Sequence, residues 1–508
     1  MKTFGCAIIG INAIIVTIEV NSDKGIQFFM VGLPDSAVKE SYQRIFASFA
    51  NLGYRFPKKR LTVNLAPADI KKEGSAYDLP LALGIMAVSE QLCPDRLEAY
   101  VAMGELSLDG SLNPIRGVLP MAIKAREEGF RGIIVPKENA KEAAIVEGIE
   151  VIGARNLTEV VDFLNGDRAI EPERVDLQSL VQEEVCLFDF QDVRGQENIK
   201  RALEIAASGS HNVLLIGSPG SGKTMLAKRL PSILPPMTLA EALETTKIHS
   251  VAGLMGGNKT LMVTRPFRSP HHSISDAGLC GGGSFPQPGE ISLAHNGVLF
   301  LDEVPEIQRH TLEILRQPME DRVITISRAK MTVQYPANFM LVAAMNPCPC
   351  GYYNHPDRVC VCNPSDVQRY LNKISGPLMD RIDLHVEVQP VPYDQLSDTR
   401  RGESSASIRE RVVKARKIQE ERFRPYPGIH ANAQMTPQLL QRHCVLDAPS
   451  QETLRNAMHR LGLSARAYDR ILKVARTIAD LDGSDRIQSA HLAEAITYRS
   501  LDRDSWGS

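Results

Sequence analysis

The stretch from His211 to Leu230, HNVLLIGSPGSGKTMLAKRL, decides the fold of this chain. Its apolar beginning predicts a buried strand, its middle, GSPGSGKT, matches the pattern GxxxxGK(S/T), and its end has helical periodicity. In such a strand–loop–helix unit, glycines let backbone N–H groups point inward around phosphate oxygens. A glycine-rich turn without a ligand is the plain alternative, but strand, loop, lysine and helix agree. We therefore predict a nucleoside triphosphate site in an α/β domain.

The loop supplies most of the predicted contacts to the nucleotide. Lys223 should reach the β- and γ-phosphates, and the Thr224 hydroxyl should ligate Mg²⁺. Val193, upstream of the strand, is a further candidate contact. The residues expected to bind the nucleotide are Val193, Gly217, Ser218, Pro219, Gly220, Ser221, Gly222, Lys223 and Thr224.

Two further apolar strands end in polar residues. GVLFLDEV, residues 297–304, carries Asp302 and Glu303 at its end, and FMLVAAMN ends in Asn346. Carboxylates in such a place are costly unless they act on a ligand, and the carboxyl edge of a sheet is where ligands bind. We expect Asp302 to hold Mg²⁺ through water, Glu303 to polarise the attacking water and Asn346 to orient that water. An ordinary polar strand end is the alternative.

Two arginines complete the predicted hydrolytic site. GPLMDRIDLHVEV places Arg381 before another strand, and GLSARAYDRILKVARTIADL places Arg466 at the start of a helix. An arginine supplied across a subunit boundary stabilises charge on the transferring phosphoryl group and makes hydrolysis depend on assembly. For either arginine alone, a surface salt bridge would be the simpler interpretation.

The order of these motifs resembles that of AAA+ ATPases. The insert RPFRSPHHSISDAGLCGGGSFPQPGEISLAHNGVLFLDE is similar to the magnesium-chelatase branch, and essentially all 508 residues resemble the ComM/YifB family of magnesium-chelatase-like ATPases. The resemblance implies a hexameric ring, with Arg381 as arginine finger and Arg466 in the sensor-2 position. It also implies a helicase that acts on DNA and drives branch migration during uptake and integration of transforming DNA.

The N-terminal part is similar to the proteolytic domain of Lon, as in GELSLDGSLNPIRGVLPMAIKAREEGFRGIIVPKENAKEA. A site of that type needs a serine nucleophile and a lysine base. Alignment without gaps puts Ala76 and Leu119 at those two places, so we expect a structural or DNA-contacting domain. Ser75 paired with Lys124 is the remaining protease alternative.

The expected organisation is that of an α/β multidomain protein. We expect a Lon-protease-like α+β domain over residues 1–166, an acidic linker over 167–189, an AAA+ ATPase core over 190–390 and a helical lid domain over 391–508.

The segment DRVITISRAKMTVQYPANF predicts a β-hairpin with Arg328 and Lys330 near its tip. A basic tip can follow a DNA backbone without reading sequence, although a solvated tip is the commoner case. The stretch from Phe267 to His272 and the helix containing RERVVKARK are weaker candidates for DNA contact. For the adjacent His271 and His272, hydrogen bonds within a loop are more plausible than metal binding.

Four of the nine cysteines, Cys348, Cys350, Cys360 and Cys362, form two CxC pairs directly after Asn346. In a reducing compartment, such a cluster is expected to bind one structural Zn²⁺. His355 is a spare ligand. Reduced thiols and redox sensing are the alternatives. A bound ion would fasten the loop between the strand that ends in Asn346 and the helix leading to Arg381.

Composition and charge further limit the ligands and the cellular compartment that can be expected for this chain. The formal charge of −2 gives no whole-molecule attraction to polyanions, so any such site must be a local patch. The scattered remaining cysteines argue against a disulfide framework. The apolar start MKTFGCAIIGINAIIVTIEV is interrupted by Asn12 and is interpreted as a buried strand, and no run reaches the roughly 18 apolar residues that span a bilayer. We expect a cytoplasmic protein.

The sequence therefore predicts a hexameric, Mg²⁺-dependent ATPase that acts on single-stranded or branched DNA. One alternative is the motor subunit of a metal chelatase, whose partner would insert a metal into a tetrapyrrole. The other is an ATP-dependent protease or protein remodeller.

Overall fold

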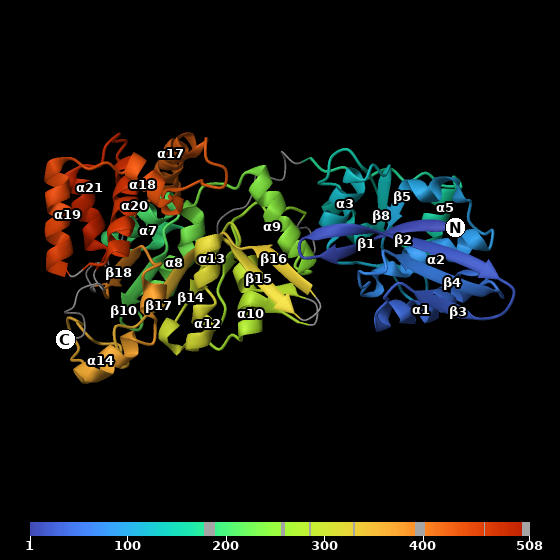
Figure 1. Cartoon of the computed structure of the whole chain (residues 1–508), viewed down its shortest axis with the longest axis horizontal. Helices are drawn as coiled ribbons and strands as arrows, with labels where there is room; N and C mark the ends of the chain where they lie inside the picture. Colours follow the sequence, from blue (N-terminus) through green and yellow to red (C-terminus); the bar gives the residue numbers. More distant parts are fainter. Residues whose placement is uncertain are drawn as a thin grey trace. The chain divides into compact units, whose positions relative to one another are not determined.

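The chain folds into two compact units (Figure 1). The computed structural model describes residues 1–176, 188–255, 260–283, 286–328, 331–391, 402–461 and 463–499. Unit 1 consists of Met1–Glu183, Leu239–Val263 and Pro286–Pro288. Unit 2 consists of Glu184–Thr238, Thr264–Phe285 and Gly289–Ser508. No helix in the described ranges is long and apolar enough to cross a lipid bilayer.

Unit 1 is built on a seven-stranded mixed sheet. Its strand order is β3 (Phe28–Val31), β4 (Arg60–Ala66), β2 (Asn12–Asp23), β1 (Lys2–Ile9), β5 (Tyr100–Ala102), β8 (Gly132–Pro136) and β9 (Glu150–Ala154). The apolar N-terminal run, expected as one strand, forms the antiparallel hairpin β1–β2, because Gly10 adopts a φ of +63° and reverses the chain before Asn12. A short ladder, β6 (Glu105–Leu106) with β7 (Leu112–Asn113), lies outside this sheet.

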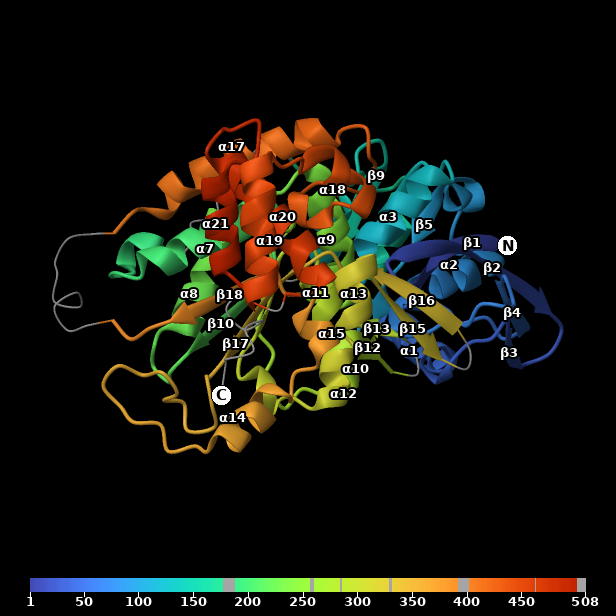
Figure 2. The same cartoon turned by 60° about the vertical axis from the view of Figure 1, so that its left-hand side comes forward.

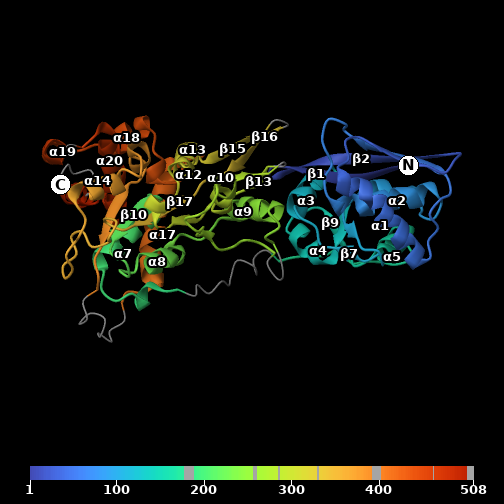
Figure 3. The same ribbon diagram turned by 90° about the horizontal axis from the view of Figure 1, so that it is seen from below.

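Helices cover the sheet of unit 1. They are α1 (Ser36–Leu52), α2 (Asp78–Val88), α3 (Val118–Glu127), α4 (Lys137–Ala143) and α5 (Leu157–Asn165). In Figure 3, α1 and α2 lie on the same side of β2. Nearly every residue of α2 is buried, as expected for a helix that is apolar all round.

Helix α9 (Leu239–Val251) also belongs to unit 1, although its sequence falls within the range expected for the ATPase core. The backbone carbonyl of its Ser250 accepts a 3.1 Å hydrogen bond from Gly117 N, and its hydroxyl donates to the buried carboxylate of Glu142. That carboxylate also accepts from Leu119 N at 3.0 Å, so it joins α9 to the start of α3.

Unit 2 contains a five-stranded sheet in which every pairing is parallel. The order is β11 (Phe267–Arg268), β14 (Val298–Leu301), β17 (Met340–Met345), β10 (Val213–Gly217) and β18 (Leu384–Val388). Strands β10, β14 and β17 are buried along their whole length, which explains their continuous apolar sequences. The predicted multidomain α/β architecture is confirmed.

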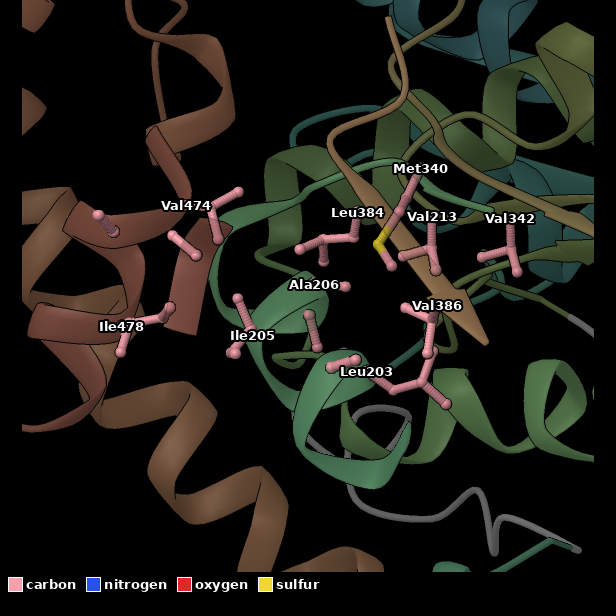
Figure 4. Close-up of a cluster of buried hydrophobic side chains, with 14 of the residues drawn as sticks. Leu203, Ile205, Ala206, Val213, Met340, Val342, Leu384, Val386, Val474 and Ile478 are labelled. Carbon is pink, nitrogen blue, oxygen red and sulfur yellow. The ribbon is translucent and has the colours of Figure 1, made fainter. Parts of the chain in front are cut away.

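One hydrophobic core joins this sheet to helices from both ends of unit 2 (Figure 4). Leu203, Ile205 and Ala206 of α7 (Glu197–Gly209) face side chains of β10, β17 and β18. Val474 and Ile478 of α20 (Ala465–Leu481) pack on the other side of α7. The five-stranded sheet and the C-terminal helices therefore share one core.

Shorter helices and a helical end complete unit 2. Around the sheet lie α8 (Lys223–Arg229), α10 (Asp276–Cys280), α11 (Glu290–Leu293), α12 (Arg309–Glu313), α13 (Arg316–Asp321), α14 (Pro364–Leu371) and α15 (Gly376–Met379). The C-terminal helices are α17 (Ser405–Phe423), α18 (Pro437–His443), α19 (Ala448–Leu461), α20 and α21 (Ser489–Thr497), which gather together in Figure 2.

The predicted hairpin is present as β15 (Val323–Arg328) and β16 (Met331–Pro336). Its ladder runs from the pair Val323–Pro336 to the pair Arg328–Met331. The hairpin starts directly after α13, and three residues separate it from β17. Lys330, expected near the tip, lies outside the described residues.

Candidate active site

The loop after β10 has the backbone geometry that a phosphate cradle requires. Gly220 and Gly222 adopt φ values of +80° and +92°, in the left-handed region that favours glycine. A Cβ on Gly217 would lie 2.3 Å from the carbonyl oxygen of Val388, so only glycine fits there. Helix α8 follows at Lys223. The sequence pattern and the local conformation therefore agree.

Lys223 lies inside this loop. Only 8% of it is exposed, and Nζ donates to the carbonyl oxygens of Gly217 at 2.6 Å and Ser218 at 3.0 Å. It also lies 3.3 Å from Oδ1 of Asn346, which follows β17. Burial lowers the pKa of Lys223, while Asp302 and Glu303 oppose that shift. The ammonium group is thus held where β10 and β17 end.

The side chains of Thr224 and Asp302 meet at the same edge of the sheet. Thr224 Oγ1 donates to Asp302 Oδ2 at 2.7 Å, and the other carboxylate oxygen accepts from Glu303 N at 2.9 Å. A hydroxyl and a carboxylate are oxygen ligands of the kind that Mg²⁺ prefers. These two side chains therefore fit a magnesium ion bound beside a nucleotide.

Glu303 has a partner that the sequence did not reveal. Its Oε2 lies 3.1 Å from Nδ1 of His272, and its backbone has a φ of +50°. The ring of the neighbouring His271 contacts that of His272 in a tilted arrangement, with ring centroids 4.0 Å apart, and its Nδ1 lies 2.8 Å from the hydroxyl of Ser273. The hydrogen bonds within a loop that were expected for both histidines are found for His271. His272 instead contacts Glu303, the expected catalytic carboxylate. Nothing in the sequence pattern signals this pairing.

Val193, the predicted upstream contact of the nucleotide, lies in the interior of unit 2. It is 1% exposed and belongs to the hydrophobic core of unit 2. Gln196, three residues later, donates through Nε2 to the carbonyl oxygen of Ser221 at 3.0 Å and to that of Gln389 at 3.2 Å. Its φ of +59° was not foreseeable from the sequence. Gln196 is therefore the upstream residue that touches the loop.

The two arginines are each bound to a carboxylate of the same protomer. Arg381 is 9% exposed, and its guanidinium contacts Glu320 and donates to Pro377 O at 2.5 Å. Arg466 forms a 2.9 Å ion pair with Asp380, and its side chain is 67% exposed. The expectation made Arg381 an arginine finger, supplied across a subunit boundary, and put Arg466 in the sensor-2 position; in the structure Arg381 is largely enclosed within its own chain.

The four cysteines come together as a cluster. Their Sγ atoms all lie within 4.8 Å of one another, with Cys348 at 3.3 Å from Cys350 and 3.7 Å from Cys360. Tetrahedral Zn–S bonds of about 2.3 Å separate the sulfurs by about 3.8 Å, so the set fits one zinc ion. Cys348 is buried and the other three are partly exposed. His355 is not part of this group.

The cysteine loop packs against the phosphate loop. A Cβ on Gly351 would lie 2.6 Å from Cδ of Pro219, and Gly351 has a φ of +83°. Residues of both loops, Gly217 and Ser218 on one side and Tyr353 to Pro356 on the other, line a common small pocket. The cluster therefore supports the wall of the candidate nucleotide site.

Comparisons with known proteins agree with this geometry. Models of three families, described as magnesium chelatase subunit ChlI, subunit ChlI of Mg-chelatase, and magnesium chelatase subunit ChlI C-terminal, match residues 189–396, 18–139 and 402–499, respectively. Competence protein ComM of Haemophilus influenzae is 46% identical over 506 residues, which cover 98% of this chain and 97% of that protein. The chain belongs to the ComM/YifB family. The uncharacterized protein YifB of Salmonella typhimurium is likewise 46% identical, over 502 residues that cover 98% of this chain and 96% of that protein.

Membership of the ComM/YifB family makes this chain an AAA+ ATPase of the magnesium-chelatase-like type, for which ATP and Mg²⁺ are implied. The 38 kDa subunit of magnesium chelatase from Cereibacter sphaeroides is more distant, with 26% identity over 176 residues that cover 32% of this chain and 53% of that protein.

The ComM/YifB chain does not assemble the alternative protease pair in unit 1. Ser75 Oγ donates to Glu105, and Lys124 forms a 2.5 Å ion pair with Glu128. The hydrogen bond with Glu128 raises the pKa of Lys124, whereas a lysine that acts as a base needs a lowered pKa. Leu119, aligned with the lysine of Lon, is fully buried. The geometry therefore gives no support to peptide hydrolysis.

Proposed function

We propose that this ComM/YifB protein is a cytoplasmic, ATP-driven DNA motor that assembles as a hexameric ring. In this proposal it promotes branch migration during homologous recombination in natural transformation. One relative bears the name competence protein, which agrees with such a role.

The observation that carries the proposal is the path from the hairpin to the ATP site. The hairpin β15–β16 presents the exposed Arg328 at its end. Three residues after β16, the chain enters β17, whose following residue, Asn346, lies 3.3 Å from Lys223. DNA bound at Arg328 would thus act on the strand that leads to the nucleotide.

We assign the hydrolytic roles as follows. Lys223 binds the β- and γ-phosphates, Thr224 and Asp302 hold Mg²⁺, and Glu303 accepts the proton of the attacking water. Asn346 orients that water. Arg381 and Arg466 stabilise the charge that develops on the phosphoryl group, with the arginine finger supplied by a neighbouring subunit.

We assign one structural Zn²⁺ to Cys348, Cys350, Cys360 and Cys362. Four thiolates leave no open coordination position, so the ion would fasten the loop and take no part in hydrolysis. The packing of Gly351 on Pro219 supports a role in shaping the nucleotide site.

The decisive experiment measures ATP hydrolysis with and without single-stranded, duplex and four-way-junction DNA. We expect DNA to stimulate the wild-type protein and Arg328→Ala to lose most of that stimulation. Arg455→Ala is the matched control, because Arg455 is an exposed arginine on α19. Labelled junctions then test branch migration directly. Hydrolysis that is indifferent to every DNA would contradict the proposal.

A metal-chelatase motor is the second candidate, favoured by the matching chelatase family models. Stimulation of hydrolysis by a tetrapyrrole-binding partner, in the absence of DNA stimulation, would favour it. ATP-dependent remodelling of a protein is the third, and stimulation by unfolded protein in place of DNA would indicate it.

A further inference from the structure

The Arg381 side chain is held in its own protomer by an incomplete set of contacts. Nη2 contacts the carboxylate of Glu320, and Nη1 donates to Pro377 O at 2.5 Å. Within the described residues, the buried Nε has no hydrogen-bond partner. A guanidinium has five N–H groups, and a buried one without an acceptor is unfavourable. The contacts therefore hold the guanidinium in place but leave its Nε–H without an acceptor.

Glu320 belongs to the structural element that carries the hairpin. It lies in the last turn of α13, and β15 begins at Val323. The intervening Arg322 has a φ of +58°, and its guanidinium donates to Asn338 Oδ1 at 2.7 Å. Its carbonyl oxygen accepts from Ala337 N at 2.7 Å, directly after β16. Both ends of the hairpin are thus fastened next to Glu320.

The backbone of Arg381, in contrast, is fastened to the central sheet. Its carbonyl oxygen accepts from Asn212 Nδ2 at 3.0 Å, immediately before β10. Asp383, two residues later, is buried and lies 3.2 Å from His211 Nδ1 and 3.1 Å from Arg470 Nη1. The peptide on which Arg381 sits is therefore fixed, and its side chain is the part that can change partners.

We propose that Glu320 is a positioning residue that latches Arg381 in an inactive orientation until the hairpin is loaded. The proposal rests on the roles proposed above for Arg381 and for the hairpin. While Glu320 binds the guanidinium, the arginine is turned inward and does not serve the ATP of a neighbouring subunit. A displacement of the hairpin moves α13 and separates the pair. The arginine then exchanges a carboxylate for the phosphoryl oxygens, which are the same class of anionic acceptor.

The geometry indicates that, when the ion pair opens, the carboxylate of Glu320 is the partner that moves into solvent. Glu320 is 58% exposed, so water solvates it when the arginine leaves. Arg381 is mostly buried, so it needs a new anionic partner when Glu320 leaves, and the phosphoryl group of a neighbouring nucleotide would supply one.

The test is Glu320→Gln, which keeps the shape of the side chain and removes its charge. We expect the kcat for ATP without DNA to rise about fivefold, while the KM for ATP and the kcat with saturating DNA stay at wild-type values. The ratio of stimulated to basal kcat therefore falls towards one. Glu320→Asp, which restores the charge, should bring back part of the stimulation ratio. A purely structural role would not produce this pattern.

Glu452→Gln is the matched control, because Glu452 is 57% exposed and pairs with Arg455 on α19 at 2.9 Å. It should leave both rates unchanged. Light scattering at the assay concentration checks that each variant assembles as the wild type does, and circular dichroism checks its fold.

The double variant Glu320→Gln, Arg381→Ala distinguishes a failure of the proposed latch from a failure of the proposed role of Arg381 in hydrolysis. It should be as inactive as Arg381→Ala alone. An unchanged basal kcat in Glu320→Gln, with Arg381→Ala inactive, overturns the latch but leaves the role of the arginine intact. Wild-type hydrolysis by Arg381→Ala overturns the proposed role of the arginine and the latch with it. A raised basal kcat in Glu320→Gln, in a protein that no DNA stimulates, supports the latch and contradicts the DNA motor.

Discussion

The ammonium group of Lys223 lies 3.3 Å from the side-chain oxygen of Asn346, although 123 positions separate the two residues in the sequence. The contact joins the start of α8 to the end of β17, because β10 and β17 are parallel neighbours. Asp302 follows β14, the next strand in the sheet, and binds Thr224. Three adjacent strand ends therefore define one site.

Lys223→Ala should abolish nucleotide binding as well as hydrolysis. The substitution removes the only charge inside the phosphate loop, Gly217 to Thr224. We expect hydrolysis to fall at least about 100-fold, as for the loss of a single transition-state donor. Phosphate release and binding of a fluorescent ATP analogue measure the two effects. Lys228→Ala, on the exposed side of α8, should behave as wild type.

Glu303→Gln should separate binding from hydrolysis. The amide retains the size of the carboxylate but cannot accept the proton of the attacking water. We expect kcat to fall about 100-fold or more, with little change in the KM for ATP. Quenched samples should then contain bound ATP and little ADP. An equal rise in KM would indicate that Glu303 acts in binding.

The purified protein should contain one zinc ion per chain. Replacement of Cys360 and Cys362 by serine should remove the ion, measured by mass spectrometry of the metal content. Because Gly351 packs on Pro219, we also expect weaker ATP binding in that variant. Cys93→Ser, which changes an exposed thiol in unit 1, should retain the ion. Wild-type protein free of metal, with unaltered ATP affinity in the serine variant, would contradict this prediction.

Salt should weaken DNA binding with a slope that depends on Arg328. Each phosphate contact contributes about 0.9 to the slope of log affinity against log salt on duplex DNA. If Arg328 makes one such contact, Arg328→Ala should reduce the slope by about one. Fluorescence anisotropy over a salt series measures it. An unchanged slope would remove Arg328 from the DNA-binding surface.

Acid should destabilise unit 2 through Asp383. Burial alone would raise the pKa of this carboxyl, but Arg470 and His211 outweigh burial and hold the pKa well below its usual range. A pKa that is lower in the folded state stabilises the protein above the unfolded value of about 3.9, and this contribution is lost as the pH falls below it.

Asp383→Asn should therefore lower the free energy of unfolding by about 3 kcal/mol at pH 7, because it breaks a buried charge pair. The difference from wild type should shrink below about pH 4. Urea unfolding at several pH values measures it, with Asp485→Asn as an exposed control. A difference that does not vary with pH would show that the charge of Asp383 is not responsible.

Local motifs made the geometry of the candidate nucleotide site predictable from the sequence. The loop Gly217–Thr224 carries its conformation in its glycines, and apolar strands such as β14 end at residues whose polarity marks the edge of a sheet. The hairpin β15–β16 was likewise evident, because its strands are adjacent in the sequence.

Pairings between distant segments were not predictable. His272 meets Glu303, and Glu320 meets Arg381, only because helices and loops pack around a sheet whose strand order differs from the sequence order. The contact of Gln196 with the carbonyl oxygen of Ser221 was not predictable either, because it goes with an unusual backbone φ of +59° at Gln196, whereas the nucleotide contact predicted for Val193, which is 1% exposed, stays a prediction.

The position of helix α9 in the sequence means that unit 1 cannot be produced as a single continuous fragment of this chain. It completes unit 1 from a position between α8 and β11, so the border of that unit is not a single point in the gene. A fragment that stops at residue 176 would lack Ser250, so the Glu142 carboxylate would lose the hydroxyl that donates to it and keep the hydrogen bond from Leu119 N. Expression of the N-terminal unit alone therefore calls for a circular permutant or for a fusion that adds residues 239–263. A recombination event that exchanged only the first part of the gene would replace unit 1 without its own helix α9.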